Sequence, residues 1–115
     1  MAFIAFARRF FEHLASDEYG LALGELDASS KRWTKRSLQA ALNAATGGAR
    51  VTSANGLEQS AKPVVEELLE GEYRLRHRLP IDGKWANVQA VFLFRQKPDS
   101  GYFHVDLLAI EKTAG

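Results

Sequence analysis

Residues 72–95 read E-Y-R-L-R-H-R-L-P-I-D-G-K-W-A-N-V-Q-A-V-F-L-F-R, and this segment indicates the chain's architecture most directly. From Tyr73 to Leu79, apolar or aromatic residues alternate with arginines, a period of two that is typical of a half-buried strand. Asp82-Gly83 predicts a two-residue hairpin turn, because both central residues of such a turn need a positive φ. A second strand is therefore expected over about residues 85–95.

The hairpin also predicts which side chains share a face of the sheet. The expected pairs are Ile81–Lys84, Leu79–Ala86, His77–Val88, Leu75–Ala90 and Tyr73–Phe92. A further turn at residues 98–101 precedes a last strand over about residues 102–111. If its parity is compatible, this strand adds Phe103, Val105, Leu107 and Ala109 to the same apolar face, whereas a bulge would swap its faces.

The first half of the chain has helical periodicity instead. Apolar residues recur at three- and four-residue spacing from Phe3 to Leu14, which predicts one amphipathic helix. Ser16 is the expected N-cap of a second helix, and Thr34 caps a third that Gly47-Gly48 ends. Between the halves we expect a short strand at 51–53 and a loop at 54–63. Residues 64–69 fit either a helix or a strand.

These elements predict one α+β domain over residues 1–115, with a helical part (1–48) and a sheet part (49–115). The 115-residue length suits a single domain, and a hydrophobic content of 46% supplies one core. Because helices precede strands, the helices are expected to pack on one face of a curved antiparallel sheet.

The composition excludes several kinds of site. The chain has no cysteine, which rules out disulfides and thiolate chemistry and favours the cytoplasm. Fifteen basic and fourteen acidic residues give a net charge of +1, which predicts no attraction to nucleic acid or membranes. Arg8 and Arg9 follow the apolar residues at the N-terminus, the reverse of a secretory signal, so a mature, soluble chain is expected.

The sheet face opposite the predicted core mixes arginine, aromatic and apolar residues, a composition typical of protein interfaces. The alternative is that the first helix or residues 54–69 cover part of it. The candidate partner-binding residues are Arg74, Arg76, Arg78, Trp85, Gln89, Arg95, Tyr102, His104 and Asp106.

His104 and Asp106 lie two residues apart on one expected strand and so point the same way. In a pocket they could act as a base and its orienting carboxylate, whereas on an exposed face they form an ordinary polar pair. His77, on the apolar face, is interpreted as a core or rim histidine. The three histidines lack metal-ligand spacing, so neither a metal nor a cofactor is predicted.

The sequence has two basic clusters that are candidate nucleic-acid sites. One is Lys31, Arg32, Lys35 and Arg36 around Trp33, and the other is the stripe of Arg74, Arg76 and Arg78. Acidic residues of comparable number offset them, namely Glu58, Glu66, Glu67, Glu70 and Glu72. A nucleic-acid partner is therefore not predicted, and the acidic stretch fits either a basic partner or a solvated surface.

The helical part contains F-F-E-H-L-A-S-D-E-Y-G-L-A-L (residues 10–23) and R-W-T-K-R-S-L (residues 32–38), and several strands follow it. This order of segments resembles the nuclear-transport-factor-2-like superfamily. The resemblance implies a cone-shaped α+β fold, a pocket between helices and sheet, and dimerisation through the sheet. It implies no single function, since that superfamily includes enzymes, binding modules and immunity proteins.

The sheet part contains L-P-I-D-G-K-W (residues 79–85), A-V-F-L-F (residues 90–94) and V-D-L-L-A-I (residues 105–110). These segments resemble uncharacterised small bacterial proteins, some of which look like toxin-immunity proteins. This resemblance implies direct, stoichiometric binding of a cognate toxin, with no catalytic motif. We therefore expect a non-enzymatic protein-binding domain. The alternative is a pocket protein that binds or transforms a small apolar ligand through His104 and Asp106.

Overall fold

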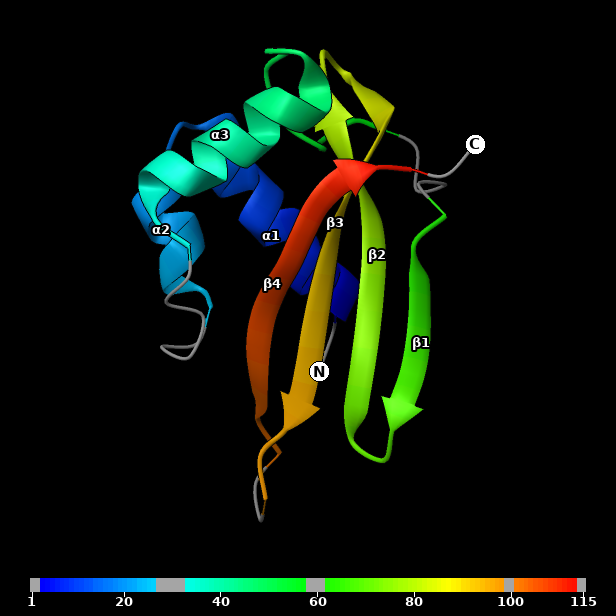
Figure 1. Cartoon of the computed structure of the whole chain (residues 1–115). Coiled ribbons are helices and arrows are strands. Elements are labelled where there is room, and N and C mark those ends of the chain that lie inside the picture. Colours follow the sequence, from blue (N-terminus) through cyan, green and yellow to red (C-terminus); the bar gives the residue numbers. More distant parts are fainter. Residues whose placement is uncertain (1–2, 27–32, 58–61, 99–100, 114–115) are drawn as a thin grey trace.

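The computed structural model confirms the α+β class (Figure 1). It describes residues 3–26, 33–57, 62–98 and 101–113. Four antiparallel strands form one sheet in the order β1-β2-β3-β4. The elements are α1 (Phe3–Ala15), α2 (Tyr19–Gly24), α3 (Lys35–Thr46), β1 (Val64–Leu69), β2 (Glu72–Ile81), β3 (Lys84–Gln96) and β4 (Phe103–Lys112). Among the helices of these residues, none combines the length and apolar character needed to cross a membrane.

The third helix has the ends that the sequence predicts. Thr34 Oγ1 accepts a hydrogen bond from the backbone N–H of Ser37 at 3.0 Å, and Ser37 Oγ accepts one from the Thr34 N–H at 2.8 Å. This capping box satisfies two amide groups that the first turn leaves open. At the other end Gly47 has a φ of 69°, the left-handed conformation expected after a helix.

The predicted cap at Ser16 is wrong. The backbone N–H of Ser16 donates to the carbonyl of Glu12 at 3.1 Å, so Ser16 belongs to the last turn of α1. Asp17, with a φ of 57°, then turns the chain out of that helix. α2 therefore begins only at Tyr19, with Glu18 as an N-cap whose side chain makes no capping hydrogen bond.

The core lies between the helices and one face of the sheet. Figure 1 shows α1 crossing behind β3 and β4, and α3 lying beside the end of β4. Phe6, Phe10 and Phe11 on α1 are buried against Phe92 on β3, with ring centroids 5.3–6.5 Å from that of Phe92. Phe3 contacts Phe94 in the same way, at 4.3 Å. Aromatic side chains thus fill the space between the two layers.

A partly buried hydrogen bond joins the segment before α3 to the last strand. Trp33 Nε1 donates a hydrogen bond to the carbonyl oxygen of Leu107 at 2.7 Å, and the ring packs against the core.

We expect Trp33→Phe to lower the free energy of unfolding by about 1 kcal/mol, because it removes the donor and keeps an aromatic ring. Urea titration measures the change. A loss below about 0.3 kcal/mol would show that solvent replaces the donor.

The predicted hairpin turn is confirmed, but the register beyond it differs. Asp82 and Gly83 have φ values of 50° and 76°, and Ile81 pairs with Lys84. The ladder is irregular between Arg78 and Pro80, where proline has no N–H to donate. The pairs that follow are therefore two residues from those predicted: His77–Ala90, Leu75–Phe92 and Tyr73–Phe94. A shift of two keeps the side chains of these pairs on their predicted face.

The last strand changes faces partway along. Leu107 pairs with Phe92, but the next pair is Ala109 with Val91, so Leu108 forms a bulge. Ala109 therefore lies on the face opposite the predicted one, and Ile110 returns to pack against the core.

Trp85 also lies on the helix side, contrary to prediction. Its ring centroid is 5.4 Å from that of His77, and Arg8 Cζ of α1 lies 5.5 Å from the Trp85 ring. The irregular ladder beside Pro80 breaks the strict alternation on which the prediction rested.

The undecided segment 64–69 is β1, an edge strand that pairs only with β2 among the described strands. Both faces of β1 are largely exposed, and its exposed apolar residues are Val64, Val65, Leu68 and Leu69. The short strand expected at 51–53 is reduced to a single bridge between Val51 and Ile81. Several residues named in the sequence analysis lie outside the described residues: Lys31 and Arg32, residues 58–61 of the expected loop, which include Glu58, and the turn residues Asp99 and Ser100.

Candidate functional site

The open face is the side of the sheet turned away from α1, and it faces the viewer in Figure 1. Its side chains form four rows that run across the strands, each row fixed by the backbone register. The rows are Arg78–Gln89–Glu111, Val64–Arg76–Val91–Ala109, Glu66–Arg74–Leu93–Asp106 and Glu72–Arg95–His104. Seven of the nine predicted partner-binding residues therefore have defined neighbours on this face: Arg74, Arg76, Arg78, Gln89, Arg95, His104 and Asp106.

Carboxylates neutralise most arginines of the open face. Glu66 on β1 bonds both arginines opposite it, with Arg74 Nη2 at 3.3 Å and Arg76 Nη1 in closer contact. Arg95 Nη2 lies 3.1 Å from Asp106 Oδ2. Because these side chains are partly exposed, the pairs contribute little to the free energy of unfolding, but they hold the guanidinium groups in place.

Apolar side chains lie between these ion pairs. Val91 is only 5% exposed although it is on the open face, between Arg76 and Ala109 in its row. Leu93 in the next row is half-buried. Apolar residues at the centre and charged residues around them are the arrangement found in protein–protein interfaces.

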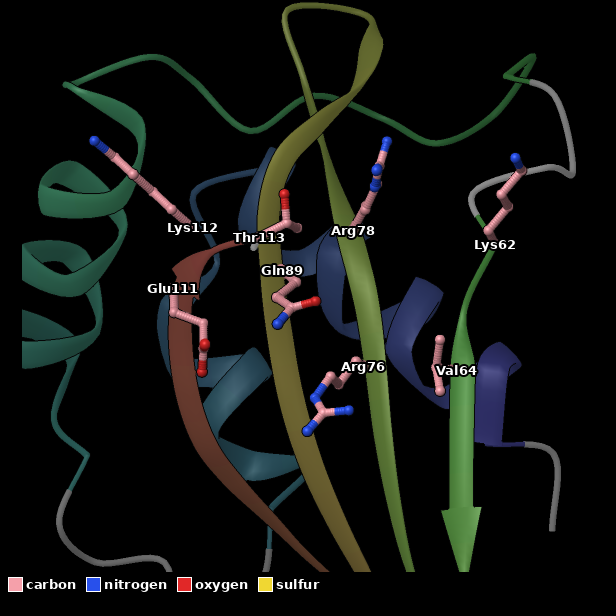
Figure 2. A pocket seen from close by; sticks show the side chains of 8 residues that line it. All are labelled: Lys62, Val64, Arg76, Arg78, Gln89, Glu111, Lys112 and Thr113. Atoms are coloured by element: carbon pink, nitrogen blue, oxygen red, sulfur yellow. The ribbon is translucent and has the colours of Figure 1, made fainter. Parts of the chain in front are cut away.

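A hollow of about 450 Å³ lies at one end of the open face (Figure 2). In Figure 2, Arg76 and Gln89 lie on neighbouring strands in front of the sheet, Arg78 and Lys62 reach toward the same end of it, and Lys112 extends away at the rim. The hollow is lined by Lys62, Val64, Arg76, Arg78, Gln89, Glu111, Lys112 and Thr113. Four of these carry a positive charge and one a negative charge, so the hollow is basic.

Two of the predicted residues lie apart from this face. Trp85 is on the helix side, as described above. Tyr102 is 75% exposed just before β4, at the end of the sheet away from the hollow. The sequence-predicted set is therefore brought together in part: the arginines, Gln89, His104 and Asp106 share one face, and Trp85 does not.

His104 and Asp106 share the open face rather than an enclosed pocket. His104 is exposed and stands opposite Arg95, and Asp106 accepts a hydrogen bond from the same arginine. Neither residue lines the basic hollow. The space between helices and sheet, where a cone-shaped fold would hold a ligand, is occupied by the phenylalanines of the core. This geometry supports the reading of an ordinary polar pair.

His77 lies inside the core, with 1% of its surface exposed. Its Nδ1 is 2.8 Å from the carbonyl oxygen of Arg78 and donates to it in the neutral ring. Burial lowers the pKa of His77, the nearby charge of Arg8 lowers it further, and the hydrogen bond to the carbonyl acts in the opposite direction. His77 is therefore a neutral packing residue, in contact with the rings of Phe11 and Trp85.

Among the residues of the open face and its hollow that sequence reasoning missed are Lys62, Val64, Glu66 and Glu111. Lys62, Val64 and Glu66 reach the open face only because residues 64–69 form the strand β1. The sequence of that segment, V-V-E-E-L-L, fits a helix and a strand equally well. Only the Glu66–Arg74 and Glu66–Arg76 contacts reveal that two of the three arginines in the stripe are neutralised.

Within the described ranges, no three histidine or carboxylate side chains are grouped as a metal site. We compared the chain with models of protein families, with curated proteins and with solved structures, and none of the three comparisons found a significant match. Any function must therefore be argued from the open face itself.

Proposed function

We propose that this chain is a non-enzymatic binding domain that docks a protein partner on the open face. The observation that carries the proposal is the row Glu66–Arg74–Leu93–Asp106, where a half-buried leucine lies between held charges on a face that α1 leaves uncovered. Preorganised charges favour recognition because their side chains lose little further freedom on binding.

The partner that we propose is a toxin that the chain neutralises by direct binding. The C-terminal segments that resemble immunity-like proteins form β3 and β4, which supply half of the open face. Stoichiometric inhibition requires an interface and no catalytic group, and the fixed charges of the open face would speed association with a complementary surface. A second copy of this chain is the competing occupant of the same face.

The test compares partner capture by two leucine variants. We expect Leu93→Asp to abolish capture of a single stoichiometric partner from the native cell, because a carboxylate replaces the apolar centre of the interface. Leu21→Asp is the matched control, since Leu21 is 54% exposed on α2, away from the open face. Mass spectrometry identifies the captured protein, and co-expression tests whether the chain restores growth in its presence.

Three results would overturn the proposed function. Equal loss of the partner in both leucine variants would show that the open face is not the interface. A captured protein that does not impair growth would exclude the toxin role. A wild-type chain that elutes as a dimer, and that Leu93→Asp makes monomeric, would assign the open face to self-association.

A further inference from the structure

The basic hollow differs from the rest of the open face in its charge balance. In the two middle rows Glu66 bonds Arg74 and Arg76, and in the last row Arg95 bonds the Asp106 of its neighbouring row. In the first row, however, Arg78 stands opposite the neutral Gln89, and Glu111 is one strand further away. Among the residues that the structure describes, Arg78 and Lys62 form no ion pair.

Positive charges that share one hollow repel each other, and an anion that enters relieves this repulsion. Arg78, Arg76 and Lys62 line a space of about 450 Å³, which is large enough for more than one carboxylate group. The planar guanidinium group of arginine pairs with a carboxylate through two parallel hydrogen bonds. The neutral Gln89 at the centre adds an amide that donates as well.

We propose that this hollow binds the carboxylates of an acidic protein segment in which glutamate or aspartate residues alternate with apolar ones. This inference rests on the proposed function, because it names the chemistry of the partner. The apolar requirement comes from the adjoining row, where the accessible side chains of Val64 and Ala109 lie in the same row as Arg76. A strand-like segment with alternating residues would place its carboxylates in the hollow and its apolar side chains over that row.

A nucleic acid fits this surface less well. Its phosphates would need a continuous basic track, but Glu66 and Asp106 interrupt the open face in the row next to the residues that line the hollow. Base stacking needs exposed aromatic rings near the cations. Trp85 is on the helix side and Tyr102 is beyond the other end of the sheet.

The test uses a blocked hexapeptide of alternating leucine and glutamate, with its leucine–glutamine twin as the neutral probe. We expect the acidic peptide to shift the backbone amide resonances of Gln89 and Glu111, and to bind more weakly as salt rises. Arg78→Gln combined with Lys62→Gln should weaken binding at least about tenfold, a factor within the range of charged hydrogen bonds. Arg78→Lys should retain part of the affinity, because it keeps the charge and loses the planar fork.

Arg50→Gln is the matched control, since Arg50 does not line the hollow and is already paired with Asp17, with Arg50 Nη2 2.8 Å from Asp17 Oδ2. It should leave peptide binding within about twofold of wild type, because it removes one positive charge from the chain and leaves the hollow intact. All variants must give the circular dichroism spectrum of the wild-type chain.

Equal affinity for the two peptides would overturn the acidic-segment inference. So would tighter binding of inorganic phosphate or of a single-stranded oligonucleotide, since either would assign the hollow to phosphate. These outcomes are separate from the failure of the proposed function. If the hexapeptide does not bind but Leu93→Asp still abolishes partner capture, the open face is an interface and its hollow does not recognise acidic segments.

Discussion

Phe92→Ala is expected to lower the free energy of unfolding by about 3–5 kcal/mol. Phe92 is fully buried on β3, and its ring contacts those of Phe6, Phe10 and Phe11 on α1. Removing it leaves a cavity that three rigid rings cannot readily fill. Because a domain of this size is typically stable by only about 5–15 kcal/mol, such a loss would leave it close to unfolding.

Chemical denaturation of the variant measures this loss directly. Ile4→Ala is the matched control, because Ile4 belongs to the same helix but is 37% exposed, and it should cost less than about 1 kcal/mol. If Phe92→Ala cost no more than Ile4→Ala, the aromatic layer would not be what holds α1 to the sheet.

The second large effect is a loss of stability in acid that depends on His77. Burial is the main cause that lowers the pKa of His77 in the folded chain, whereas in the unfolded chain histidine titrates near 6.5. Below that pH the unfolded chain takes up a proton that the folded chain does not. The free energy of unfolding therefore falls as the pH falls, by up to about 1.4 kcal/mol per pH unit, until the folded chain is protonated as well.

Denaturant titrations at pH 7.5, 6.5 and 5.5 measure the slope, and His77→Phe should reduce it by the contribution of this one group. Identical slopes for wild type and His77→Phe would mean that the folded chain accommodates the imidazolium.

The main elements of the fold were predictable because local rules determine them. Asp82-Gly83 predicted the hairpin turn, and Thr34 and Gly47 predicted the two ends of α3. The register was not predicted, although its cause is visible in the sequence. Pro80 cannot donate to the ladder, so an irregularity beside it follows from the chemistry of proline.

The bulge in β4 also has a sequence signal that strict alternation overlooks. Val105 and Leu107 are two apart, but the next core residue, Ile110, follows after three, and such a change of spacing indicates an extra residue. The open face was predictable in part for the same reason. Side chains on regular portions of β2, β3 and β4 were placed correctly, whereas Trp85 and Ala109 lie beyond an irregularity.

The basic hollow and the neutralised arginines could not be predicted, because they depend on contacts between segments far apart in the chain. Glu66 meets Arg76 only because β1 pairs with β2, and the sequence of β1 does not distinguish strand from helix. Charge counted along the sequence indicated a basic stripe on β2. In the folded chain Glu66 neutralises Arg74 and Arg76, so the excess positive charge lies at the end of the open face that holds Arg78.

The exposed edge of β1 also bears on how the chain behaves when it is concentrated. Among the described strands β1 is paired on one side only, and a strand edge with Val65 and Leu69 exposed is a template for strand addition, the first step of fibrillar aggregation. Glu66 and Glu67, at the centre of that strand, oppose stacking of identical copies because like charges would repeat along the fibril. Low pH weakens the core around His77, so storage in acid would bring more partly unfolded chains to this template.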